Sequence, residues 1–268
     1  MAKAGKRMPA SLRKRKMAKA GKRMPASLQK RMVDMDIRKL LRPASWALRG
    51  KITYCEDGLA TINNSSFVDE ERFAKAYAIA AKENTIGTPT LMHWRAKTIC
   101  WAASHAKALG GDFVECGVYR GFLSRVAMEY IGFAGMGQKF YLLDTYEGAA
   151  QEGANFKASH YEPTYDAVAG AFAPFKNAVI VKGMVPETLP LVQSERVAYL
   201  HLDMNNPVPE MAAAGHFWGR MPVGGVIISD DYGFPTYEKT KKAFDDFAKS
   251  KGTCVLPIPT GQGILIKV

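Results

Sequence analysis

Short apolar runs and stretches with helical spacing alternate along residues 110–268 of this chain. Apolar runs typical of buried strands occupy 112–117, 139–145, 177–183, 197–203 and 225–230. Helical spacing occupies 121–131, 164–172, 208–221 and 236–250. The closing segments, TCVLPIP and GQGILIKV, predict a terminal antiparallel pair. This order of elements predicts an α/β fold with a doubly wound, mostly parallel sheet that carries helices on both faces.

The region before residue 110 has a different pattern. Residues 33–66 are irregular, with a short strand and turn within LRGKITYCEDG, and predict an arm that leads into the domain. Two helices follow, one over 67–83 with acidic residues in its first turn and one from near Pro89 to Leu109. The predicted divisions of the chain are a tail over 1–32, an arm with helices over 33–109, and an α/β domain over 110–268.

The positive charge of the chain is concentrated at its beginning. The formal net charge is +12, from 37 basic and 25 acidic residues. Twelve basic residues and no acidic ones lie in residues 1–32, so the remainder is formally neutral. The segment MAKAGKRMPASL at 1–12 returns at 17–28, and its low apolar content predicts a disordered tail.

Three interpretations of this tail remain open. A basic arm would bind nucleic acid or another polyanion in a salt-dependent manner. An arginine-rich start without acidic residues is also typical of an organellar transit peptide. A duplicated leader or cloning artefact, with Met17 as a second start, explains the repeat most directly. Nucleic acid is otherwise a disfavoured partner, because the neutral remainder offers no basic track.

Length and cysteine usage narrow the class of protein further. A chain of 268 residues with 47% hydrophobic content has enough material for a globular core. No apolar run approaches the roughly 20 residues that cross a bilayer, so we expect no membrane partner. Four widely spaced cysteines without a CxxC pair suggest neither a zinc site nor a disulfide framework. We expect free thiols and a cytoplasmic location.

The segment GGVIISDDYG places two adjacent carboxylates, Asp230 and Asp231, directly after an apolar run. Ligands in open α/β sheets gather outside the carboxyl ends of such strands. Two ionised carboxylates side by side repel each other, so a cation beside them would explain the pair. A solvated turn would explain it too, because Asp-Asp-Tyr-Gly contains favoured turn residues.

A third carboxylate, Asp203, follows the preceding predicted strand. Because those two strands are neighbours in a doubly wound sheet, we expect Asp203, Asp230 and Asp231 to converge. Three carboxylates make a hard oxygen site for Mg²⁺ or a similar cation.

A glycine-bearing turn, Glu115 to Gly121, follows the first strand of the domain. Its glycines allow a ligand to approach backbone N–H groups at a helix N-terminus, and Glu115 suits a ligand with an amino group. The spacing lacks GxGxxG, so a nicotinamide cofactor is disfavoured. Asp144, after the second strand, is placed to accept ribose hydroxyls, although a capping role is the alternative. Together these residues favour an adenosine-containing ligand without a diphosphate.

In this order, ECGVYRG, LLDTYEG, VKGMVPETLP, LHLD and PVGGVIISDDYG resemble the macrocin-type O-methyltransferases (TylF, MycF and novobiocin type). These form a branch of the class I S-adenosylmethionine-dependent methyltransferases. The resemblance covers residues 60–267 and implies a Rossmann-like, seven-stranded sheet with an antiparallel last strand. The implied metal ligands are Asp203, Asp230 and Asp231, and the implied S-adenosylmethionine contacts are Glu115, Gly117, Tyr119 and Asp144.

The reaction that this resemblance implies moves a methyl group from S-adenosylmethionine to a hydroxyl oxygen that Mg²⁺ makes more acidic. Natural acceptors in the family are sugar hydroxyls on secondary metabolites. The family commonly shows Asp-Gly-Asp after the fourth strand, the second acid being the general base, whereas this chain has Asp203-Met204-Asn205. An amide cannot take up that proton.

Three explanations for Asn205 stay open. The metal alone acidifies the acceptor, or a histidine such as His201 or His216 acts as the base, or the acceptor is intrinsically acidic, for example a phenol. Both histidines also fit packed positions, His201 in a strand and His216 on an apolar helix.

Two functions follow from the sequence. The first is a divalent-metal-dependent O-methyltransferase that acts on a small hydroxylated molecule. The second is an inactive methyltransferase-like protein whose basic tail binds nucleic acid or another polyanion. Residues 147–163 suit a lid or a plain surface loop. The arm suits closure of the site or contact within a homo-oligomer.

Overall fold

The structure is a computed structural model that describes residues 51–83, 91–148 and 162–268. Residues 53–268 belong to one compact unit. The basic tail, most of the arm and most of the predicted lid lie outside the described residues, so the hypotheses about them stay predictions. Pro89 lies outside them too, but the helix predicted to start near it begins at His93. None of the helices described combines the length and apolar character that a membrane span requires.

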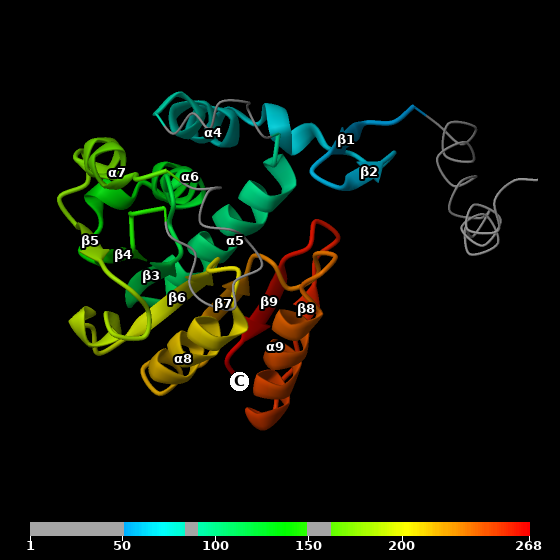
Figure 1. Cartoon of the computed structure of the whole chain (residues 1–268). Coiled ribbons are helices and arrows are strands. Elements are labelled where there is room, and N and C mark those ends of the chain that lie inside the picture. Colours follow the sequence, from blue (N-terminus) through cyan, green and yellow to red (C-terminus); the bar gives the residue numbers. More distant parts are fainter. Residues whose placement is uncertain (1–50, 84–90, 149–161) are drawn as a thin grey trace, which may run out of the picture. The chain divides into compact units, whose positions relative to one another are not determined.

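One sheet contains seven strands: β3 Asp112–Cys116, β4 Phe140–Asp144, β5 Ala178–Lys182, β6 Val197–Leu202, β7 Val226–Ser229, β8 Leu256–Pro257 and β9 Gly263–Ile266. Their order across the sheet is β5-β4-β3-β6-β7-β9-β8 (Figure 1). Strands β3 to β7 are parallel, and β9 runs antiparallel to both β7 and β8. The predicted mostly parallel sheet with an antiparallel last strand is therefore confirmed.

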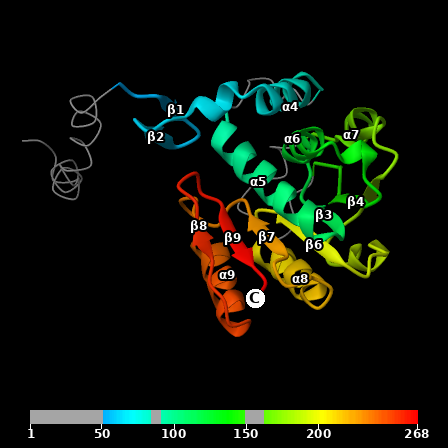
Figure 2. The same cartoon turned by 180° about the vertical axis from the view of Figure 1, so that it is seen from behind.

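Helices cover both faces of this sheet (Figures 1 and 2). The α-helices described are α4 Glu71–Glu83, α5 His93–Leu109, α6 Phe122–Ile131, α7 Tyr165–Phe172, α8 Pro207–Trp218 and α9 Glu238–Ser250. Short 3₁₀ turns are η1 Ser66–Asp69, η2 Phe133–Gly135 and η4 Leu189–Leu191, and a small hairpin pairs β1 Tyr54–Glu56 with β2 Leu59–Thr61. Helices α4 to α7 lie on one side of the sheet, and α8 and α9 lie on the other.

Alternate residues of the central strands enter two separate cores. Phe113 and Tyr199 pack with the α4 to α7 layer, whereas Val114 and Leu200 pack with the α8 and α9 layer. All four side chains are fully buried. Burial on both faces explains why these strands appear in the sequence as nearly continuous apolar runs.

Two predicted boundaries were wrong. The helix predicted from residue 67 begins only at Glu71, because the backbone is extended at Glu70 (ψ 121°), which separates η1 from α4. The carbonyl of Glu70 accepts from the N–H of Ala74 at 2.8 Å, so the α-helical bonding starts at the acidic residues that favour a helix N-terminus. The penultimate strand contains only Leu256 and Pro257, because proline donates no ladder hydrogen bond.

The strand order reverses between β3 and β6, which brings the loops after these two strands together. The N–H of Asp203 donates to the carbonyl of Cys116 at 2.9 Å. Gly117 has φ +89°, and a Cβ built on it would lie 2.1 Å from the carbonyl oxygen of Asp203. Only glycine fits this crossing point, which is the switch point where ligands bind in such sheets.

We expect Gly117→Ala to destabilise the fold by more than about 3 kcal/mol, because backbone strain and a steric clash add together. Chemical unfolding of the purified protein measures this. Gly137→Ala is the matched control, since nothing lies within 4 Å of a Cβ there. Equal stability of the two variants would contradict the close approach of the two loops.

Candidate active site

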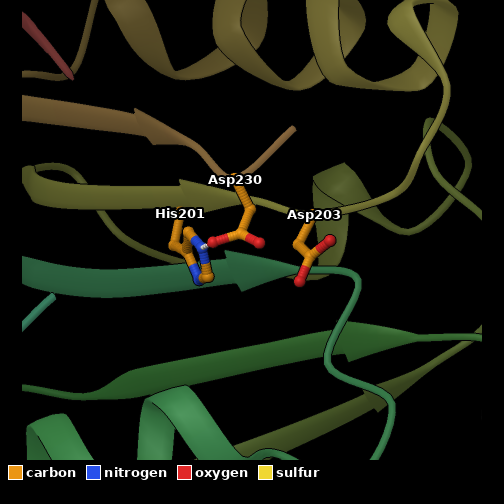
Figure 3. A group of neighbouring side chains, drawn as sticks. All are labelled: His201, Asp203 and Asp230. Atoms are coloured by element: carbon orange, nitrogen blue, oxygen red, sulfur yellow. Dashed lines mark ion pairs between the residues drawn. The ribbon is translucent and has the colours of Figure 1, made fainter. Parts of the chain in front are cut away.

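The carboxyl ends of β6 and β7 bring the predicted acidic residues together. Leu202 lies opposite Ser229 in the parallel register, and each strand is followed directly by an aspartate, Asp203 and Asp230. The N–H of Asp230 also donates to the carbonyl of Leu202 at 2.9 Å. Potential ligand atoms of His201, Asp203 and Asp230 lie within 4.8 Å of one another, with Asp230 between the other two (Figure 3).

His201 is completely buried between two carboxylates. Its Nδ1 lies 2.8 Å from Oε1 of Glu115, and its Nε2 lies 3.6 Å from Oδ1 of Asp230. Burial disfavours the imidazolium, but the hydrogen bonds and charges of Asp230 and Glu115 outweigh it and raise the pKa of His201 to about 10. An imidazolium cannot accept a proton, so His201 acts here as a cation, and its role as a base stays a prediction.

Glu115 faces inward, toward His201. The side chain is 2% exposed, and its second oxygen, Oε2, accepts from the hydroxyl of Ser124. Ser124 fixes one oxygen of the Glu115 carboxylate, and the other oxygen contacts His201. Glu115 therefore holds the imidazole ring in one orientation. The predicted contact of Glu115 with the cofactor stays a prediction.

Asp230 is held by three groups from different parts of the fold. Arg95 Nη1 lies 2.8 Å from Oδ2, and Nε2 of Gln262 donates to Oδ1 at 2.9 Å, the oxygen that also faces His201. Burial raises the pKa of Asp230, but the charge of Arg95 and the contacts with His201 and Gln262 outweigh it and hold that pKa well below its usual range. Asp230 is therefore ionised throughout the ordinary pH range.

The other two carboxylates show the opposite shift. Burial and the charge of Asp230 raise the pKa of Asp231 to about 7. Burial and the charges of Asp230 and Asp231 raise the pKa of Asp203 well above its usual range. Asp203 and Asp231 thus favour protonated forms until a cation compensates their charge.

The donor set fits a hard divalent cation. Oδ2 of Asp231 is buried without a hydrogen-bond partner among the described residues. Buried polar atoms of this kind normally have partners, so this oxygen points to a missing group. Carboxylate oxygens are the ligands that Mg²⁺ prefers, and Asp203 and Asp230 bring them together from adjacent strand ends. Asp231 is not part of this close cluster, so its predicted role as a third ligand stays a prediction.

Asp144 holds the turn after β3 in place. Its Oδ2 accepts from the N–H groups of Val118 and Tyr119 at 2.7 and 2.8 Å, and its Oδ1 accepts from the N–H of Tyr146 at 2.8 Å. Tyr119 takes a left-handed conformation, φ 49°, between Gly117 and the start of α6. The turn therefore lies at a helix N-terminus beside the strand ends, as predicted for a cofactor loop.

Asn205 lies in the turn that connects β6 to α8. The residue has φ 56°, and its Oδ1 accepts from the hydroxyl of Tyr237 at 2.6 Å. The next residue, Asn206, caps α8 by accepting from the N–H of Val208 at 3.0 Å. His216 lies farther along α8, where its ring packs edge-on against Phe217 at 4.8 Å between centroids.

Several residues of the site were missed by the sequence reasoning. Arg95 comes from the first turn of α5, Asp57 from a short hairpin, and Gln262 from the turn before the last strand. A charged residue on a helix is ordinarily a solvated one, so nothing in the local pattern distinguishes Arg95. The buried Glu210 was also missed, because it looks like an ordinary acidic residue in a helix first turn.

The chain matches the family model described as macrocin-O-methyltransferase (TylF) over residues 54–257. The solved structure of the O-methyltransferase NovP matches with a TM-score of 0.57 at 14% identity, covering 76% of this chain and 100% of that chain. CalS11, a TDP-rhamnose 3'-O-methyltransferase in calicheamicin biosynthesis, matches with a TM-score of 0.50 at 15% identity, over 76% of this chain and 96% of that one. No curated protein matches. The structural likenesses, at such low identity, show a shared fold.

Glu210 is a buried carboxyl that contacts the loop after β6, and its ionisation can be tested by changing the pH. It is 0% exposed; Oε1 accepts from the N–H of Met204 at 3.2 Å, and Oε2 is buried without a partner among the described residues. Burial first, and then the charge of Asp231, raise its pKa from 4.5 to about 8. Between these values the folded protein binds the proton more tightly than the unfolded chain, so stability falls as the pH rises.

We expect Glu210→Gln to remove this decline, so that its stability relative to the wild type is higher at pH 8.5 than at pH 5. The difference should be at least about 1 kcal/mol, the order of one pKa unit. Thermal unfolding in EDTA at the two pH values measures it. Glu238→Gln is the matched control, because Glu238 lies exposed in the first turn of α9 and accepts a local N–H at 3.3 Å. If the stability of Glu210→Gln relative to the wild type does not increase from pH 5 to pH 8.5, the pKa of Glu210 is not raised.

Proposed function

The chain belongs to the macrocin O-methyltransferase (TylF) family and is an S-adenosylmethionine-dependent O-methyltransferase, and we propose that it uses a divalent cation to methylate a small hydroxylated molecule. The observation that carries the metal dependence is the meeting of half-buried Asp203 with buried Asp230 at neighbouring strand ends, with buried Asp231 next in the chain. Two of these carboxylates have raised pKa values, and Oδ2 of Asp231 has no partner among the described residues. A cation is the group that would relieve all of these features together.

We assign the cofactor to the turn between β3 and α6. The turn leads directly into the N-terminus of α6, whose dipole favours a polar ligand, and Asp144 keeps the turn in shape through its bonds to Val118 and Tyr119. The turn and the carboxylates lie at the same switch point. A bound methyl donor and an acceptor held at Asp203 would therefore be neighbours, which is the positioning that methyl transfer needs.

The cation would supply one element of chemistry when bound: it lowers the pKa of an acceptor hydroxyl that it contacts. The protein supplies the rest. Asp230 stays ionised through Arg95 and His201, which gives the site a permanent anchor. Asn205 has an amide in place of a carboxylate, so the acceptor proton has to leave by another route. His201 could accept it only after losing its own proton, which its raised pKa disfavours, so we favour release to solvent.

The acceptor class that we propose is a sugar hydroxyl of a secondary metabolite, with a phenol as the alternative. The family description and the TDP-rhamnose acceptor in the description of CalS11 support a sugar. The amide of Asn205 supports an acceptor that ionises readily. Methyl transfer from labelled S-adenosylmethionine to a panel of nucleotide sugars and phenols, with Mg²⁺ and with EDTA, separates these possibilities.

Asp231→Asn tests the metal site with little damage to packing, because the neutral amide replaces a carboxylate that already favours its neutral form. We expect unchanged or higher stability in EDTA and unchanged binding of S-adenosylhomocysteine. Binding of Mg²⁺ should weaken at least about tenfold, with a matching loss of turnover. Calorimetric titrations with each ligand measure the two affinities.

Asp166→Asn is the matched control, since Asp166 is an exposed residue on α7. It should bind both ligands like the wild type. Wild-type affinity for Mg²⁺ in Asp231→Asn, or full turnover of the wild type in EDTA, would sink the metal assignment while leaving the methyltransferase intact.

A further inference from the structure

The side chain of Arg95 joins two carboxylates that come from distant parts of the chain. Nε and Nη2 contact Oδ2 and Oδ1 of Asp57 at 3.2 and 2.5 Å, which makes a two-pronged pair. Nη1 contacts Oδ2 of Asp230 at 2.8 Å. The ring of Phe234 lies 4.9 Å from the guanidinium carbon and covers one face. Arg95 thus connects the β1–β2 hairpin directly to a proposed metal ligand.

The open end of the hairpin is anchored independently of Arg95, because Tyr54 and Thr61 are buried and the hydroxyl of Tyr54 donates to the carbonyl of Leu91 at 2.8 Å. Its turn is more exposed: Asp57 and Gly58 both have positive φ, and the flanking Cys55 and Glu56 are exposed. At this turn, Asp57 has a side chain that is only 7% exposed because it faces Arg95. A two-stranded hairpin is marginal in isolation, so its placement depends on such anchors.

Nη1 of Arg95 contacts Oδ2 of Asp230, the oxygen that a cation at this site would also need. Oδ1 of Asp230 accepts a hydrogen bond from Gln262 and faces His201, whereas Oδ2 accepts one from Arg95. The oxygen of Asp230 that is not joined to His201 points toward Asp203 (Figure 3). A divalent cation between Asp203 and Asp230 would therefore meet the guanidinium at Oδ2, and two cations at one oxygen repel each other.

We propose that Arg95 is a positioning residue that holds Oδ2 of Asp230 in the ion-free enzyme and yields it to the divalent cation, so that cation binding is coupled to the placement of the β1–β2 hairpin. The proposal rests on the proposed metal dependence. Asp57 keeps its two-pronged pair with Arg95, so the hairpin moves with the guanidinium. Residues 53–61 then become the segment whose placement responds to the ion.

The test uses Mn²⁺ as the probe, with calorimetry for affinity and hydrogen exchange for residues 53–61. In the wild type we expect Mn²⁺ to reduce the protection of the hairpin. Arg95→Gln should bind Mn²⁺ about tenfold more tightly, because a like charge has left the site. Its hairpin should already be unprotected and should no longer respond to Mn²⁺.

Two further variants keep the test decisive if Arg95→Gln folds poorly. In Asp57→Asn, Arg95 keeps its contact with Asp230 and loses only its ion pair with the hairpin. The amides of residues 53–61 should therefore lose their protection from hydrogen exchange both with and without Mn²⁺. Glu56→Gln is the matched control, because it removes one exposed carboxylate from the same hairpin, and it should behave like the wild type. Asp57→Glu should partly restore protection, since it restores the pair with the guanidinium.

The outcomes separate the two proposals. Mn²⁺ affinity in Arg95→Gln equal to or weaker than wild type overturns the competition, and so does a hairpin that ignores Mn²⁺ in the wild type. Failure of every protein, wild type included, to bind Mn²⁺ overturns the metal dependence and this proposal with it. Tighter binding in Arg95→Gln, together with a hairpin freed by Mn²⁺ in the wild type, supports both.

Discussion

Repulsion among Asp203, Asp230 and Asp231 governs the arrangement of the site. Two like charges about 4 Å apart cost about 4 kcal/mol at an effective dielectric constant near 20, more than one ordinary hydrogen bond returns. The protein meets this cost in two ways. Asp230 is compensated by the positive charges of Arg95 and His201 and keeps its charge. At Asp203 and Asp231, burial and the charges of neighbouring carboxylates outweigh the same two positive charges, so the pKa values of both groups are raised and they favour protonation.

The topology of the sheet explains why these groups meet. His201 and Asp203 are two residues apart at the end of β6, so their side chains point to the same face of the sheet. Glu115 lies beside His201 because β3 and β6 pair in parallel register at these residues. The same pairing brings the cofactor turn against Asp203, where Gly117 alone permits the approach. One strand crossover therefore places the loop that we propose for the methyl donor beside the acidic cluster.

Most of the sheet could be predicted from the sequence, because buried parallel strands leave a local signal and each ends in a recognisable acid or glycine. The convergence of Asp203 with Asp230 followed from that strand order. The partners of these residues could not be predicted in the same way. Arg95 and Asp230 are 135 positions apart, and their contact depends on how α5 lies on the sheet, which no local pattern encodes. The environment of Glu115 was also hidden, since its inward orientation toward His201 is a property of packing.

The charge balance of the site explains how one fold can serve the enzyme with and without a cation. In the ion-free protein, Arg95 and His201 neutralise Asp230 and Glu115, while protons neutralise Asp203 and Asp231 to the extent that their raised pKa values allow. A divalent cation that displaces two protons brings the same charge that they carried, so the net charge of the buried site does not change. What such an exchange needs is room beside Oδ2 of Asp230. That room is occupied by the guanidinium of Arg95, which is why we place the proposed coupling between metal binding and conformation at this side chain.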